Sequence, residues 1–461
     1  MGQQPHALVV PFPAQGHVIP LLELSYCLVD HGFKITFVNT EINHALIAAA
    51  LPEGPSMMDQ MVRLISFDDG LAPGEDRRDL LKLRDCLMKT LPMCLEELIL
   101  KSHEPGEDKI TCMVADGMAP WVLEVAREKG LRSAAFWPMA AAVAATIMKI
   151  PKLIEDGVID ADGFPMKQEM FQLAPGLPLM NPAHLTWNCY GDRETQKEIF
   201  HLLLDDDQRN RVAEFFLCNS SYDMEQPVFA YAPKILPVGP LLTGQRLGKP
   251  VGHLWPEDRT CEAWLDQQRP NSVVYVAFGS LTTFDRGQFQ ELALGLELCD
   301  RPFLWVVRPD LVEAAIDAYP HGFRERVALR GRIVGWAPQQ RVLAHPSVAC
   351  FMSHCGWNST LEGVRNGLPF LCWPYFVDQF LNQSYICDVW RIGSKMMPDE
   401  NVIVSKEQIK SKVDELLLDE DTRERARLLK ELAQKSARNG GSSFENLKRF
   451  ADAMKHEGDK D

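Results

Sequence analysis

Long hydrophobic runs are scarce in this sequence, and none is long enough to cross a lipid bilayer. The longest apolar stretch with helical spacing, residues 139–148, covers about half of the roughly 20 residues that a membrane-spanning helix needs. The apolar run HALVVPFP (6–13) has no basic segment ahead of it, so we expect no secretory signal peptide. His6 stands where an N-myristoylation pattern requires Ser or Thr. These absences predict a cytoplasmic protein without a membrane span.

Positive charge and metal-binding patterns are scarce too. The chain has 48 Lys and Arg against 63 Asp and Glu, and its net charge of −15 argues against nucleic acid as a partner. The 12 cysteines are scattered singly, without a CxxC pair or the Cys/His spacing of zinc sites. We therefore expect reduced thiols and no metal ion.

Two motifs of common α/β enzymes are missing. The loop after the first expected strand reads PAQGHVIP (13–20), which lacks the GxGxxG spacing of a nicotinamide-dependent dehydrogenase. The GxSxG turn that carries the nucleophile of α/β-hydrolases does not occur. Both absences argue against those two enzyme classes.

Apolar strands alternate with amphipathic helices through both halves of the chain. Its 461 residues exceed what one core usually needs, and 46% hydrophobic residues is a globular value. This alternation predicts an α/β fold with parallel sheets. A stretch rich in Gly and Pro with little apolar pattern reads as a linker. The expected parts are an N-terminal domain (1–240), the linker (241–258), a C-terminal domain (259–440) and a closing helix (441–461) packed back on the N-terminal domain.

A strand, a glycine-containing loop and a helix are predicted within residues 336–379. The strand VACFMSH (348–354) precedes the loop CGWNST, Ser359 and Thr360 are suitable N-caps, and Gly367 is placed to end the helix. In parallel sheets, ligands bind at such loops. The region holds two arginines and no lysine, so a phosphate here would be held mainly by neutral donors and the helix N-terminus.

Single residues of this region fit a nucleotide. Trp336 offers a flat face for a base, Glu362 could accept from ribose hydroxyls, and Gly356 permits close backbone approach. An ordinary strand–helix–strand unit with a Trp-rich core would show a similar composition, so the composition alone leaves both interpretations open.

The same region resembles the signature box of the plant UDP-dependent glycosyltransferases (family 1). The match has WAPQ at its start, HCGWNSTLEG in its middle and DQ at its end. The resemblance implies the GT-B fold: two facing Rossmann-like domains with parallel sheets and the active site in the cleft between them. It also implies these contacts: Trp336, Ala337 and Gln339 with uracil; His354, Gly356, Asn358 and Ser359 with the diphosphate; Glu362 with the ribose; Trp357, Asp378 and Gln379 with the sugar.

The resemblance further implies a catalytic pair in the first half. His17 matches the family's general base, and Asp116, at the end of the strand ITCMVAD, matches the carboxylate that orients it. Chemistry agrees, because an acceptor hydroxyl must lose a proton to a base whose tautomer is set by a partner. Asp116 could instead be a helix N-cap, and His17 an ordinary loop histidine. Gly16, Gly279 and Ser280 are further candidates for the donor site, although the last two could form a plain turn.

The acceptor pocket should come mostly from the N-terminal half. The candidates are apolar residues near strand ends or loops, and core packing is an open alternative for each: Phe12, Met118, Trp137, Met139, Trp187 and Phe376. We expect transfer of a sugar, with inversion, to a hydroxyl or carboxyl of a small apolar plant metabolite. The expected sugar is glucose, and the expected donor is UDP-glucose. Gln379 with Trp357 is the pattern tied to UDP-glucose. No cofactor and a monomer are expected. A non-enzymatic nucleotide-sugar binder and a transferase of another UDP-sugar remain alternatives.

Overall fold

The computed structural model describes residues 4–50, 61–241, 258, 260–308, 311, 318–400 and 402–455, apart from the side chains of 48–50. The chain forms two compact units. Unit 1 is drawn from the stretches 1–166, 194–254 and 435–461, and unit 2 from 167–193 and 255–434. The predicted linker lies outside the described residues, except for Leu241 and Asp258.

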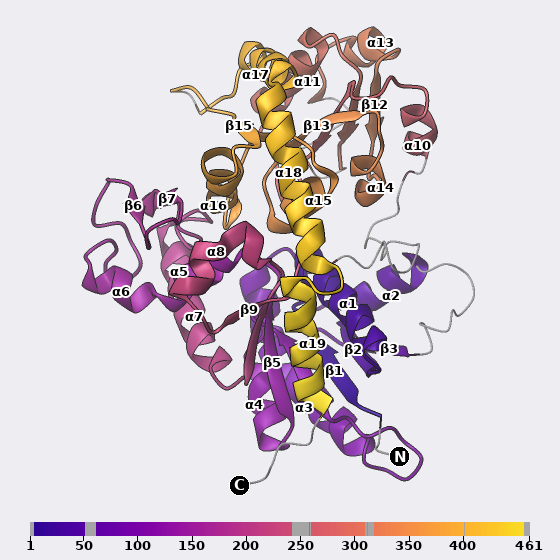
Figure 1. The fold of residues 1–461 in the computed structure, drawn as a ribbon, viewed down its shortest axis with the longest axis vertical. Helices are drawn as coiled ribbons and strands as arrows, with labels where there is room; N and C mark the ends of the chain where they lie inside the picture. Colours follow the sequence, from indigo (N-terminus) through magenta and orange to yellow (C-terminus); the bar gives the residue numbers. More distant parts are fainter. Residues whose placement is uncertain are drawn as a thin grey trace. The chain divides into compact units, whose positions relative to one another are not determined.

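Seven parallel strands form the sheet of unit 1, in the order β3-β2-β1-β4-β5-β8-β9 (Figure 1). They are β1 His6–Val10, β2 Lys34–Thr40, β3 Val62–Phe67, β4 Cys112–Asp116, β5 Arg132–Trp137, β8 Phe215–Cys218 and β9 Ile235–Pro237. Along β1, Ala7 and Val9 belong to one hydrophobic core and Leu8 and Val10 to another. The sheet is therefore buried on both faces, as expected for a parallel α/β sheet.

Helices on both faces of the sheet contribute to these cores, α1, α2 and α19 to the first and α3 and α4 to the second. The described helices of unit 1 are α1 Gln15–Asp30, α2 Glu41–Ala50, α3 Leu80–Lys101, α4 Trp121–Glu128, α5 Ala141–Met148, α6 Ile150–Glu155, α7 Arg193–Asn210, α8 Tyr222–Tyr231 and α19 Ser442–Lys455. Leu447, Phe450 and Met454 of α19 are buried in the core that also holds Ala7 and Val9. The Asn446 amide donates to the Pro237 carbonyl at 2.9 Å. The closing helix thus packs on the sheet of unit 1, although it follows the whole of unit 2 in sequence.

Unit 2 has a six-stranded parallel sheet in the order β12-β11-β10-β13-β14-β15 (Figure 1). The strands are β10 Val273–Ala277, β11 Phe303–Val306, β12 Gly331–Val334, β13 Val348–Ser353, β14 Phe370–Cys372 and β15 Gly393–Lys395. The helices are α10 Thr260–Leu265, α11 Arg286–Leu298, α13 Phe323–Val327, α14 Gln339–Leu343, α15 Trp357–Asn366, α16 Gln379–Ser384, the π-helical turn η2 Tyr385–Val389, α17 Lys406–Leu418 and α18 Glu420–Ala437. Smaller elements are β6 Phe171–Gln172, β7 Leu179–Met180 and the 3₁₀ turn η1 Pro182–His184.

Several predicted bounds differ from the structure. The predicted N-terminal domain included 167–193, but this segment belongs to unit 2, where His184 stacks on Phe380 at 4.1 Å between ring centroids.

Helix α1 begins at Gln15, although Pro20 suggested a later start, because the N–H groups of His17 and Val18 already bond to the Ala14 carbonyl. The prediction of a loop around His17 was therefore wrong.

The helix of the signature region also starts earlier than predicted. Its N-cap is Gly356, so Ser359 and Thr360 lie inside the first turn instead of capping it. The bond from the Thr360 N–H to the Gly356 carbonyl, 2.9 Å long, closes that turn. Its end was predicted correctly: Gly367 adopts the left-handed conformation (φ 72°) that favours glycine. Because its periodicity is weak, the stretch 151–200 predicts loops and short helices, whereas α7 at its end is a helix of 18 residues.

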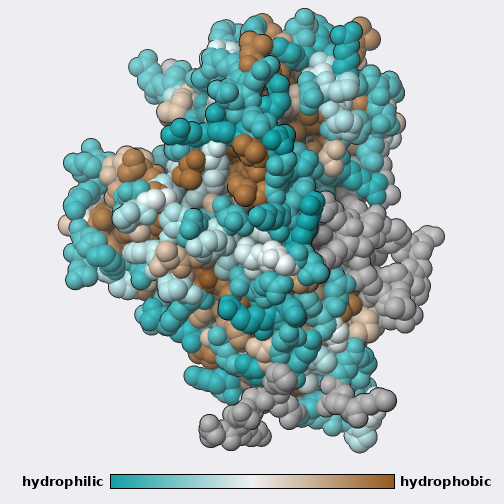
Figure 2. Space-filling view, viewed as in Figure 1, coloured by the Kyte–Doolittle hydropathy of each residue, from teal (hydrophilic) through white to brown (hydrophobic). Residues whose placement is uncertain are grey.

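Most of the visible surface is hydrophilic, and one hydrophobic patch lies over the middle of α18 (Figure 2). Two leucines of this helix, Leu428 and Leu432, are 45% and 43% exposed. No described helix is both long and apolar enough to span a membrane.

Candidate active site

Unit 1 brings together a histidine and a buried carboxylate. β1 and β4 are neighbours in the sheet, so the loop that leads into α1 and the end of β4 meet at the same edge. The Nδ1 atom of His17 lies 2.9 Å from Oδ2 of Asp116. The Asp116 side chain is fully buried, whereas that of His17 is 22% exposed.

The surroundings of the pair fix its orientation. The second Asp116 oxygen accepts the Met118 N–H at 2.9 Å, so the carboxylate cannot rotate freely. The Phe12 ring packs edge-on against the His17 ring at 5.6 Å. When Nδ1 donates to Asp116, the neutral imidazole carries its lone pair on Nε2, and the carboxylate stabilises the imidazolium that forms on protonation. The arrangement is suited to a general base.

In unit 2, three predicted nucleotide contacts form one hydrogen-bonded group. The Gln339 amide nitrogen donates to the Ser359 hydroxyl at 2.9 Å and to the Glu362 carboxylate at 2.7 Å. Its oxygen accepts from the Tyr275 hydroxyl at 3.1 Å. Burial raises the pKa of Glu362, and the bond from Gln339 opposes that rise. Residues from α14 and from α15 therefore present a carboxylate with an acceptor capacity suited to ribose hydroxyls.

His354 lies between two glycines. A Cβ atom added to Gly279 or to Gly356 would approach the His354 ring to 2.5 Å, so only glycine permits this packing. Burial lowers the pKa of His354 to about 4, with the Arg308 charge as a further cause. The ring is therefore neutral at pH 7 and adds no charge beside the N-terminus of α15.

The sugar-site candidates Asp378 and Gln379 lie where a turn enters α16. The Gln379 side-chain oxygen accepts the N–H groups of Tyr375 and Phe376 at 2.8 and 3.3 Å. Val377 has a positive φ of 59°, which is strained for a β-branched residue. The remaining predicted donor contacts of unit 2 lie close in sequence to these residues. Trp336 and Ala337 precede α14, Trp357 and Asn358 are in the first turn of α15, and Ser280 follows Gly279. Gly16 belongs to unit 1, in the first turn of α1.

The predicted acceptor contacts are divided between the two units, and in unit 1 Met118 packs against the core cluster that contains Phe12. Phe12, Trp137 and Trp187 are buried, with at most 4% exposed, and Trp187 belongs to unit 2 and not to the first half as predicted. Met118, Met139 and Phe376 are half-buried. Trp137 packs where a side chain on Gly117 would sit, which is a core position. The part of each in acceptor binding stays a prediction, as does the cleft between the two halves.

Two buried polar side chains of unit 2 were missed. Arg308 donates to the carbonyls of Ser280 and Thr282 and holds the loop after β10. Asn382 donates to the Cys355 carbonyl and to Asp378. The arginine that directly follows an apolar strand in FLWVVRP was a possible signal for the first, whereas a lone Asn within an amphipathic helix gave no signal for the second.

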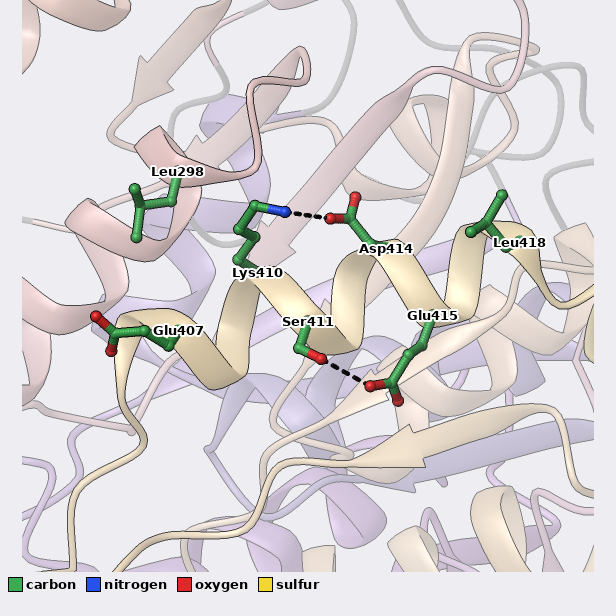
Figure 3. A pocket seen from close by; sticks show the side chains of 7 residues that line it. All are labelled: Leu298, Glu407, Lys410, Ser411, Asp414, Glu415 and Leu418. Atoms are coloured by element: carbon green, nitrogen blue, oxygen red, sulfur yellow. Dashed lines mark hydrogen bonds and ion pairs between the residues drawn. The ribbon is translucent and has the colours of Figure 1, made fainter.

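A surface hollow of about 350 Å³ lies elsewhere in unit 2 and contains none of the predicted residues. It is lined by Leu298 and by side chains of α17 that pair with one another, Lys410 with Asp414 and Ser411 with Glu415 (Figure 3). These pairs fit a solvated helix surface. Among the described residues, no group of three or more His, Cys, Asp or Glu side chains could hold a metal ion.

Comparisons with known proteins show what this chain is similar to. The family model for UDP-glucuronosyl and UDP-glucosyl transferases matches residues 248–436. UDP-glycosyltransferase 83A1 of Arabidopsis thaliana is 41% identical, covering 99% of this chain and 97% of that protein. The 7-deoxyloganetin glucosyltransferase of Gardenia jasminoides is 33% identical, covering 98% of each.

Solved structures show the same fold. A UDP-glucosyltransferase from Polygonum tinctorium that glucosylates indoxyl superposes with a TM-score of 0.82 at 27% identity, covering 99% of this chain and 100% of that one. The two parallel α/β units are the two Rossmann-like domains of the GT-B fold. The chain belongs to the plant family 1 UDP-glycosyltransferases, enzymes that transfer a sugar from a UDP-sugar to a small molecule.

Proposed function

We propose that this enzyme transfers glucose from UDP-glucose to a hydroxyl or carboxyl group of a small apolar plant metabolite, with inversion at the anomeric carbon. The observation that carries the proposal is the hydrogen bond between His17 and the fully buried Asp116. The glucosyltransferase names of two of the relatives support glucose as the sugar.

His17 is the general base of this mechanism. For a hydroxyl acceptor, its Nε2 atom takes the proton, and the oxygen attacks the anomeric carbon from the face opposite the diphosphate. The bond between that carbon and the β-phosphate oxygen breaks, and UDP leaves with the electron pair. Asp116 keeps Nδ1 protonated and stabilises the imidazolium, which lowers the cost of the proton transfer.

The leaving diphosphate would be held by neutral donors. The first turn of α15 presents backbone N–H groups, and the neutral His354 ring lies beside them without adding charge. Glu362 would accept from the ribose, and Gln379 and Asp378 would contact the sugar hydroxyls. We also propose that the enzyme works as a cytoplasmic monomer without a metal. Undiminished activity in EDTA and a monomer mass in size-exclusion chromatography with light scattering would support the last two points.

The test is intact-mass screening of plant phenolics, terpenoids and hormones with purified protein and UDP-glucose. A product heavier by one hexose is expected, and its absence with bound UDP-glucose would favour another UDP-sugar or a non-enzymatic binder. The His17→Ala variant should lose turnover while it binds UDP as the wild type does. Normal turnover by that variant would refute the assignment of the base.

A further inference from the structure

Asn382, on α16, is a fully buried amide that joins two loops of unit 2. Its nitrogen donates to the Cys355 carbonyl at 2.9 Å and to Oδ2 of Asp378 at 2.8 Å. Both hydrogens of the amide are used in this way. Both partners only accept, because a carbonyl and an ionised carboxylate have no hydrogen to donate, so the amide can be oriented in one way only.

The two partners belong to the two parts of the predicted donor site. Cys355 lies between His354 and Gly356, in the loop assigned to the diphosphate, and has a positive φ of 67°. Asp378 caps α16 and is assigned to the sugar hydroxyls. Within the described residues, one side chain thus ties the phosphate loop to the sugar-holding turn.

The contact has the features of a positioning element. The Oδ1 atom of Asn382 is buried and has no hydrogen-bond partner among the described residues. The orientation of the amide is therefore set by the two bonds that its nitrogen donates, and the oxygen is left unpaired. The bond to Asp378 is charge-assisted, which makes it stronger than an ordinary amide bond. It engages Oδ2 and thereby limits rotation of the carboxylate.

We propose that Asn382 is a positioning residue for the donor sugar: by holding Asp378 at a set place relative to the Cys355 carbonyl, it aligns the carboxylate with the sugar of a diphosphate-bound UDP-hexose. This rests on the proposed function, since it takes Asp378 as a sugar contact. The residue acts through Asp378 and need not touch the substrate. Its loss should weaken recognition of the sugar more than recognition of UDP.

The experiment measures the dissociation constants of UDP-glucose and of UDP by titration calorimetry, together with turnover. In Asn382→Ala, UDP-glucose affinity should fall about tenfold while UDP affinity stays within about threefold of the wild type, as expected for a hydrogen bond to a charged group. Asn382→Leu, which keeps a similar volume, should behave alike if the alanine variant folds poorly. Gln383→Ala is the matched control, because Gln383 is the next residue of α16 and its side-chain amide donates to the Cys372 carbonyl, at 3.3 Å. It should leave both constants within about twofold.

A double-mutant cycle with Asp378→Ala separates positioning from general stability. If Asn382 acts through Asp378, Asn382→Ala should cause less than about threefold further loss of UDP-glucose affinity in the Asp378→Ala background. An equal loss in both backgrounds, or an equal fall in UDP affinity, would overturn the inference. A wild type that binds UDP-glucose without transferring hexose would refute the proposed function, and the binding cycle would still decide the role of Asn382.

Discussion

Replacing Asp116 with Asn tests the catalytic pair most directly, because the two side chains have nearly the same shape. In the variant, Oδ1 can still accept the Met118 N–H, which turns the new amide nitrogen toward Nδ1 of His17. The amide then donates where the carboxylate accepted. The ring must carry its proton on Nε2, and the atom that should accept the acceptor's proton is blocked.

The expected loss follows from two effects. The wrong tautomer removes general-base catalysis, which contributes about 10²–10⁴-fold, and the imidazolium loses its counter-charge at 2.9 Å in a buried site. We expect kcat to fall by about 10²–10⁴-fold, or about 3–5 kcal/mol in activation free energy. In Asp116→Ala, either tautomer of His17 can form, so kcat should fall by no more than it does in Asp116→Asn.

The assay is single-turnover glucosylation followed by mass spectrometry, with UDP affinity measured in parallel. UDP binding should be unchanged, because the predicted contacts with uracil, ribose and diphosphate all belong to unit 2. The control is Asp69→Asn, since Asp69 is also buried (4% exposed) and is paired with Arg77. If Asp116→Asn kept more than a third of the wild-type kcat, the base mechanism as written would be refuted.

Four further predictions concern unit 2. Glu362→Ala should weaken UDP binding by about 1–3 kcal/mol, since a charge-assisted hydrogen bond is lost, and calorimetry would measure it; an unchanged affinity would remove Glu362 from the ribose site. Burial raises the pKa of Glu362 and UDP should favour the ionised form, so wild-type affinity should decrease as the pH falls through that raised pKa, and a titration at several pH values would show no such decrease if the residue did not contact UDP. Gln379→His should change the ranking of UDP-glucose and UDP-galactose as donors, and an identical ranking would count against Gln379 as a sugar contact. Val377→Gly should raise the free energy of unfolding by about 1 kcal/mol, because it relieves the positive φ of 59°, and urea denaturation showing no gain would argue against strain there.

The sequence by itself determined the family, the class of reaction and the alternation of strands and helices in two α/β halves. This was possible because the signature region depends on local chemistry: a buried strand, a glycine that lets the loop approach a ligand, and a helix that ends at Gly367. Each of these needs particular residue types at fixed spacing, so they can be read along the chain. The same holds for His17 and Asp116, which follow two strands that the hydrophobic pattern already predicts.

Tertiary structure decided what depends on partners distant in sequence. The segment 167–193 belongs to unit 2 because of contacts such as that between His184 and Phe380, which no local pattern encodes. The structure shows that Trp137 and Trp187 are buried, which the sequence alone did not establish. Asn382 became visible only through its two acceptors, one of which lies 27 positions away in sequence. A side chain's hydrogen-bond partners are set by packing, and packing is a property of the folded chain as a whole.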